Sequence, residues 1–290
     1  MIENYLIHLG ILICIYLILA ASLNITLGYT GIINLGHIAF FGIGAYTSAL
    51  LTLNGFPWFF AFLISGLLAA FLGFLLIIGV SRLKGDYLAL ATLGFNFIIY
   101  ALMLNLTSVT RGPLGLPNIP KPTLFGIVIN SNLAYFIFSI LIVCICLFIM
   151  YRLVKSPYGR LLEAVRDDEY GLCMLGKNTF LLKTQSIMVS AFFAGLAGSL
   201  FSHYITFIDP SAFSLLEIIL IFTIVIIGGI ASFKGSIVAT FILLLVPELL
   251  RLLPLASSVL GPLRQIFYAI ILLLVLLYRP RGLFGRVDLH

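Results

Sequence analysis

The chain has 290 residues, of which 62% are hydrophobic and only 9% are charged. Soluble domains are about 45–50% apolar and about 25% charged, because the exterior of a water-soluble globule must carry polar groups. The composition therefore argues against a soluble enzyme, a nucleic-acid-binding domain and a disordered tail. The formal net charge of +6 indicates basic cytoplasmic loops of a membrane protein, so we expect surrounding membrane lipid and no nucleic-acid partner.

Long uninterrupted apolar runs predict membrane-spanning helices. A helix needs about 20 apolar residues to cross a hydrocarbon core about 30 Å thick, whereas a β-barrel would show shorter segments of alternating polarity. We predict an all-α, polytopic transmembrane bundle, a single membrane domain over residues 1–290 with about nine or ten spans. The predicted spans are residues 5–24, 38–53, 58–80, 87–106, 133–153, 184–205, 215–231, 237–250 and 265–278.

From the end of the first span into the second, residues 28–46 hold five glycines together with Asn34 and His37. Glycine lowers helix stability by about 1 kcal/mol relative to alanine, so this segment is expected to bend or break. Broken helices at membrane depth usually line a cavity. The alternative is that the glycines only permit close contact between helices.

Two connecting segments are long enough to have a role. The outer one, residues 107–132, is rich in glycine and proline, which predicts an ordered cap full of turns. The inner one, residues 155–183, begins a helix at Ser156 and Pro157, and Leu161 and Val165 give that helix an apolar face. It is either a solvated connector or a docking element for a cytoplasmic partner.

Basic residues indicate which loops face the cytoplasm. Twelve lie in or near residues 81–86, 152–183, 232–236 and the tail after 278, and four lie on the other side, namely Arg111, Lys121, Arg251 and Arg264. The positive-inside rule places the first group in the cytoplasm. With nine spans the N-terminus is then outside, and a further crossing within residues 25–37 would reverse that end only.

Further along the chain, small residues recur at helical spacing. Ala191, Gly195 and Ser199 form one stripe, and Ala194, Gly198 and Ser202 form another, and both predict helix–helix packing faces. The pair Gly228 and Gly229 predicts a hinge or a close approach near the end of the seventh span.

The chain lacks recognisable catalytic, metal-binding and nucleotide-binding patterns. Residues 229–234 lack the Gly-Lys-Ser/Thr ending of a phosphate loop, and Cys144 and Cys146 have the wrong spacing for zinc or redox chemistry. We therefore expect no cofactor and no metal on this chain. The predicted spans offer no good acidic ion site, since Glu217 and Glu248 fall near span ends. A solute carrier of this kind needs an outside source of energy.

Several segments, in order along nearly the whole chain, resemble one family. They are residues 31–46, 82–94, 119–126, 159–169, 191–199, 228–229 and 279–285. Together they resemble the LivM-type permease subunit of branched-chain amino acid ABC importers. Arg111, Asn96 and Ala231 depart from the family pattern, the first and last standing where the family usually has glycine.

The resemblance implies a fold like that of the large, type II importers and transport of leucine, isoleucine or valine across the inner membrane of a prokaryote. The implied partners are a second permease of similar fold, two ATPase subunits that use the ATP, and an external solute-binding protein. It favours the docking role for the inner segment, with coupling residues Glu163, Ala164, Arg166, Asp167, Asp168, Glu169 and Gly176. The expected translocation path includes Gly31, Asn34, Gly36, His37, Phe41, Gly44, Tyr46 and Thr92.

Alternatives remain at this stage. One alternative is that the solute is urea, a short amide or another amino acid rather than leucine, isoleucine or valine. A secondary carrier would need an ion site within the membrane, and a membrane-embedded enzyme would need a polar catalytic cluster.

Overall fold

The computed structural model describes residues 2–80, 83, 85–124, 127–129, 131–249, 257–278 and 282–285. Within these ranges the chain is almost entirely helical. The membrane-type helices are α1 (Ile2–Asn24), α2 (His37–Leu53), α3 (Trp58–Val80), α4 (Asp86–Asn105), α6 (Asn132–Lys155), α9 (Thr179–Ile205), α10 (Leu215–Gly228), α11 (Phe233–Leu249) and α12 (Ser257–Tyr278).

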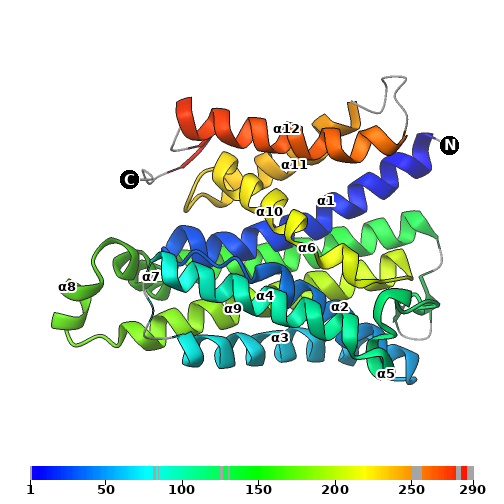
Figure 1. Ribbon diagram of the computed structural model, residues 1–290, viewed down its shortest axis with the longest axis horizontal. Coiled ribbons are helices and arrows are strands. Elements are labelled where there is room, and N and C mark those ends of the chain that lie inside the picture. Colours follow the sequence, from blue (N-terminus) through cyan, green and yellow to red (C-terminus); the bar gives the residue numbers. More distant parts are fainter. Residues whose placement is uncertain are drawn as a thin grey trace.

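Each of the nine predicted spans coincides with one of these helices, which confirms the predicted polytopic bundle. Among the described residues, six helical segments are long and apolar enough to cross a membrane, and α2, α11 and α12 contain shorter apolar stretches. The helices run along a common direction, so the connections gather at two ends (Figure 1). The predicted limits needed correction mainly at α9, which starts five residues early at Thr179, and at α12, which starts at Ser257.

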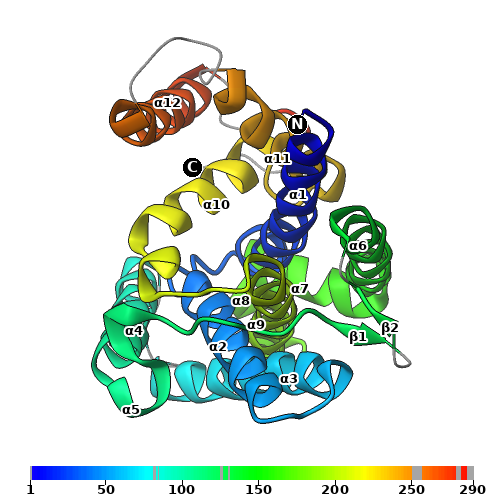
Figure 2. The ribbon, with the colours of Figure 1, turned by 90° about the vertical axis from the view of Figure 1, so that its right-hand side faces the viewer.

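Small residues position α9 at the centre of the bundle, packed against α2, α3 and α1, while α12 lies at the periphery beside α10 (Figure 2). A Cβ added to Gly44 would collide with the backbone of Gly195, and one added to Gly198 would collide with the backbone of Phe41. The small-residue stripes of α9 are therefore packing faces, as predicted. Gly44 therefore permits close contact between α2 and α9, which is the alternative explanation for the glycines of residues 28–46.

The predicted break between the first two spans is present. After α1 the chain forms a π-helical turn, η1 (Ile25–Tyr29), and residues 30–36 leave the helix before α2 starts at His37. Gly31 has φ = 72°, a conformation that favours glycine. His37 lies against Leu19 and Ser22, within the length of α1, so α2 begins inside the bundle.

The outer connection is ordered, as predicted. It contains α5 (Thr107–Thr110), η2 (Gly112–Leu114) and a two-stranded antiparallel hairpin of β1 (Thr123–Leu124) and β2 (Ile127–Val128). Leu116 pairs with Ile208 beside η3 (Pro210–Phe213), which joins the two outer connections.

At the opposite end, the inner connection forms two helices rather than the one predicted. They are α7 (Pro157–Asp167) and α8 (Glu169–Met174), separated at Asp168. Some features of the sequence fall outside the described residues: Arg82, Lys84, Gly126, Arg251, Arg279 and Arg281, and the side chains of Glu248 and Arg264.

Candidate coupling site at the α7–α8 end

α7 lies flat against the bundle through a narrow apolar face. Leu162 and Val165 are buried, and Leu161 is only partly buried, so the apolar face predicted from Leu161 and Val165 centres on Leu162 instead. Gly159 packs against the backbone of Val154 with no room for a side chain. Ser156 is the N-cap, but its hydroxyl donates to the carbonyl of Leu153 rather than capping α7, which corrects the expected cap.

Arg166 joins α7 to the break after α1. Its Nη1 donates to the carbonyl oxygen of Gly28, 2.7 Å away, in η1, and its Nε donates to Asp167 at 2.8 Å. The side chain also packs beside Gly31, because a Cβ on Gly31 would lie 2.8 Å from Arg166 Cγ. A predicted coupling residue thus contacts a predicted path residue directly.

The four acidic residues of the segment have different surroundings. Asp167 pairs with Arg166 and leaves 64% of its side chain exposed. Asp168 caps α8 by accepting from the backbone nitrogen of Gly171 at 2.9 Å, and Glu169 forms an ion pair with Lys183 of α9 at 2.6 Å. Glu163 lines a cavity described below. Asp167 is therefore the acid best placed to meet a partner.

The remaining two coupling candidates lie on either side of this group. Ala164 is partly buried against the bundle, and Gly176 is exposed with φ = 76° in the turn that leads to α9. Burial raises the pKa of Tyr158, the second residue of α7, to about 12. Tyr158 is consequently a neutral phenol at physiological pH.

Sequence reasoning missed the residues that anchor η1 to its neighbours. The Asn24 side chain donates to the carbonyl of Ser232 and to Ser236 Oγ, and it accepts from the backbone nitrogen of Ala231. Thr30 bonds to Ser186 of α9. Polar residues inside apolar runs were the available signal, but their partners lie far away in the sequence.

Most of the expected path residues are buried within this chain. His37 hydrogen-bonds to Ser22 Oγ and to the carbonyl of Leu19, and Thr92 Oγ1 accepts from the backbone nitrogen of Leu35. Phe41 and Tyr46 both pack against Phe213.

Asn34 and Gly36 form a local turn in which Asn34 Oδ1 accepts from the Gly36 nitrogen. Gly31 is the exposed member of the set, and it borders a cavity of about 360 Å³ shared with Arg166 and Glu169. Their role in translocation stays a prediction.

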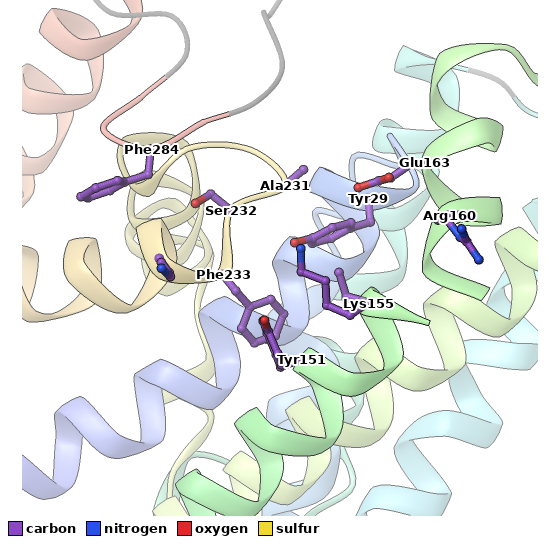
Figure 3. Close-up of a pocket in the computed structure, with 11 residues that line it drawn as sticks. Tyr29, Tyr151, Lys155, Arg160, Glu163, Ala231, Ser232, Phe233 and Phe284 are labelled. Carbon is purple, nitrogen blue, oxygen red and sulfur yellow. The ribbon is translucent and has the colours of Figure 1, made fainter. Parts of the chain in front are cut away.

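A second cavity, of about 530 Å³, lies at the same end of the bundle (Figure 3). It is bordered by η1, the end of α6, α7, and the connection between α10 and α11. Among the described residues no group of three His, Cys, Asp or Glu side chains is placed to hold a metal ion.

Among the described residues, nine apolar helices form a bundle with two short helices, α7 and α8, at one end, which is the arrangement of a multi-pass membrane protein. The family model described as "Branched-chain amino acid transport system / permease component" matches residues 5–276, and the chain belongs to this family.

Three curated relatives cover most of the chain. The "High-affinity branched-chain amino acid transport system permease protein LivM" of Escherichia coli is 36% identical over 98% of this chain and 71% of the relative. The protein of the same name from Salmonella typhimurium is 36% identical over 93% of this chain and 67% of the relative. The "Probable branched-chain amino acid transport permease protein LivM" of Methanocaldococcus jannaschii is 25% identical over 93% and 90%. No solved structure matched the chain.

Proposed function

We propose that this chain is the permease subunit of an ABC importer that carries leucine, isoleucine or valine across the inner membrane of a prokaryote. The family match and the names of the relatives support the solute class. The proposed partners are a second permease of similar fold, two ATPase subunits and an external solute-binding protein. ATP is then used by the partner subunits and not by this chain.

The observation that carries the proposal is the contact between Arg166 and Gly28. Movement of α7 and α8 by an ATPase would be passed through this contact to η1. From η1 it would reach α9 through Thr30 and the α10–α11 connection through Asn24. Discrete contacts between rigid helices of this kind are how a displacement at one end of a bundle reaches another.

The distribution of charge supports a cytoplasmic position for α7 and α8. Among the described side chains, seven basic residues lie at that end, whereas Arg111 and Lys121 lie at the other. The seven are Arg152, Lys155, Arg160, Arg166, Lys177, Lys183 and Lys234. The positive-inside rule then directs the N-terminus, which lies at the opposite end, to the outside (Figure 1).

The test combines reversal of the exposed acid with a separate change at Arg166. The variant Asp167→Lys with Asp168→Asn keeps a good N-cap on α8 and should lower co-purification of the ATPase at least about tenfold, because like charges at an interface are costly. Arg166→Gln should leave ATPase binding and ATP hydrolysis in place and lower ATP-driven uptake of leucine about tenfold.

Asp86→Lys is the matched control, because Asp86 is an exposed acid at the same end but outside α7 and α8. Undiminished assembly and uptake in both coupling variants would refute the coupling role. Uptake of urea in place of leucine would correct the solute, and loss of uptake on dissipation of ion gradients with ATP maintained would show a secondary carrier instead.

A further inference from the structure

The larger cavity at the cytoplasmic end joins the ends of two membrane helices. Lys155 stands in the last turn of α6, and Lys234 stands in the first turn of α11. Arg160 and Glu163 of α7 complete the charged part of the lining, and Figure 3 shows the amine of Lys155 and the hydroxyl of Tyr29 pointing toward one another. The cavity therefore lies at the level where a membrane helix emerges into the headgroup region.

The charge of this lining is positive. Three cationic side chains, Lys155, Arg160 and Lys234, line the cavity together with one carboxylate, that of Glu163. Within the described part of the chain none of these three cations forms an ion pair, whereas Arg166 and Lys183 nearby do. An anion is the ligand that would complete the site, and basic pockets between membrane helices on the cytoplasmic side suit lipid phosphate groups.

The remaining walls are aromatic. Tyr151 of α6 and Phe233 of α11 meet edge to face, with ring centroids 6.3 Å apart, and Tyr29 and Phe284 also line the cavity. Aromatic rings are typical of the interface between hydrocarbon and headgroups. They offer little to a free inorganic anion but match the glycerol and ester region of a phospholipid.

A lipid-facing surface leads directly to the cavity. On α6, Ile145 and Phe148 are exposed about one to two turns before Tyr151, which is itself 47% exposed. These side chains form an apolar track of the kind that acyl chains cover. One turn beyond Phe148 on α6, the guanidinium of Arg152 lies over the Phe148 ring, with Cζ 5.5 Å from the ring centroid.

We infer that this cavity binds the phosphate of an anionic phospholipid, with the acyl chains lying along α6. The bound headgroup bridges α6, α7 and α11, so it would hold the coupling helix to the bundle. This site goes beyond the proposed transport function, and its occupancy can be measured without ATPase or solute.

The test is lipid retention by the purified full chain in detergent, measured by native mass spectrometry. The probes are phosphatidylglycerol, phosphatidylcholine and inorganic phosphate. Wild type should retain phosphatidylglycerol in preference to phosphatidylcholine. Because each basic residue near an anionic headgroup changes binding about fivefold, the triple variant Lys155→Gln, Arg160→Gln, Lys234→Gln should retain at least about tenfold less phosphatidylglycerol.

A matched control removes cations of the same end that line neither the cavity nor the apolar track, Lys177→Gln with Lys183→Gln, and should retain the lipid as wild type does. Lys155→Arg should also retain it, which separates loss of charge from loss of fold. Equal retention by the triple variant and wild type would overturn the inference, and so would an equal loss in the control.

Two further outcomes would assign the cavity to another ligand and likewise overturn the inference. Displacement of phosphatidylglycerol by inorganic phosphate at comparable concentration would show a soluble anion site. A cross-link from a cysteine placed at position 155 to an ATPase subunit, with loss of the lipid on assembly, would show that an acidic protein side chain occupies it.

Discussion

Ala231 and Arg111 both hold φ at 59°, in the left-handed region where a side chain with a Cβ is disfavoured. These are two of the three positions at which the chain departs from the family pattern it resembles, which usually has glycine there. The backbone geometry explains why glycine suits both positions. At Ala231 the conformation is held by the hydrogen bond from its nitrogen to Asn24.

Replacing Ala231 with glycine should therefore stabilise the protein by about 0.5–1 kcal/mol, since relief of the left-handed strain exceeds the added freedom of the unfolded chain. The measurement is thermal or denaturant unfolding in detergent. Ala194→Gly, in the middle of α9, is the control and should be destabilising by about 1 kcal/mol. A destabilised Ala231→Gly variant would contradict the account of strain.

Asn24 is a fully buried amide that makes three hydrogen bonds across the bundle. Asn24→Leu should lower the unfolding free energy by about 1–3 kcal/mol, because the buried Ala231 nitrogen loses its acceptor, whereas the Ser232 carbonyl keeps its bonds from Ser236. The exposed Asn105 bonds only to the carbonyl of Ala101 within its own helix. Asn105→Leu is the control and should change the unfolding free energy by less than about 0.5 kcal/mol. Equal effects of the two variants would contradict a stabilising role for the Asn24 hydrogen bonds.

At the scale of elements, α10 is short because its end is closed by two different segments. The last four carbonyls of a helix lack partners within it. Gly229, at φ = 105°, donates to the carbonyls of Val225 and Ile226. The tail completes the cap, since the nitrogens of Leu283 and Phe284 donate to the carbonyls of Ile227 and Gly228. All four carbonyls of the α10 terminus are therefore satisfied.

Leu283→Pro removes one of these donors and should destabilise the α10 end by about 1–3 kcal/mol, because the buried carbonyl of Ile227 is left unpaired. Leu283→Ala keeps the backbone nitrogen and is the control. The measurement is the labelling rate of a cysteine placed at Ile227, which is buried in the wild type. Equal labelling in the proline and alanine variants would show that the tail does not cap α10.

At the scale of the whole molecule, the bundle has two chemically different ends. Cys173 in α8 is exposed at the basic end, and Leu114 in the outer connection is 81% exposed at the other. The positive-inside rule predicts that the basic end faces the cytoplasm and that the other end faces the outside. Because the helices alternate in direction, every connection at one end must share a side of the membrane.

With the other cysteines replaced by alanine, a membrane-impermeant maleimide should label Cys173 in inverted vesicles and not in right-side-out vesicles. Leu114→Cys, in a background without Cys173, should show the reverse pattern. Labelling of both positions from the same side would refute the arrangement of spans.

The sequence by itself determined the membrane class, the existence of all nine helices and the break before His37. These depend on the length of apolar runs and on glycine content, which are local properties of the chain. The family was likewise accessible from motifs in order along the chain. Helix limits were less accessible, because α9 continues five residues beyond the predicted span, past Lys183, to the cap that the Asn178 side chain forms.

Only the tertiary structure decided how the candidate site is assembled. Arg166 and Gly28 are 138 residues apart, and Asn24 lies more than 200 residues from its partners. Tertiary contacts also decide the different roles of the acidic residues, which look alike in the sequence. Asp167 pairs with Arg166, Asp168 caps α8, and Glu169 binds Lys183. Contacts between distant segments arise from how helices pack, and no local pattern records which carbonyl a given side chain will reach.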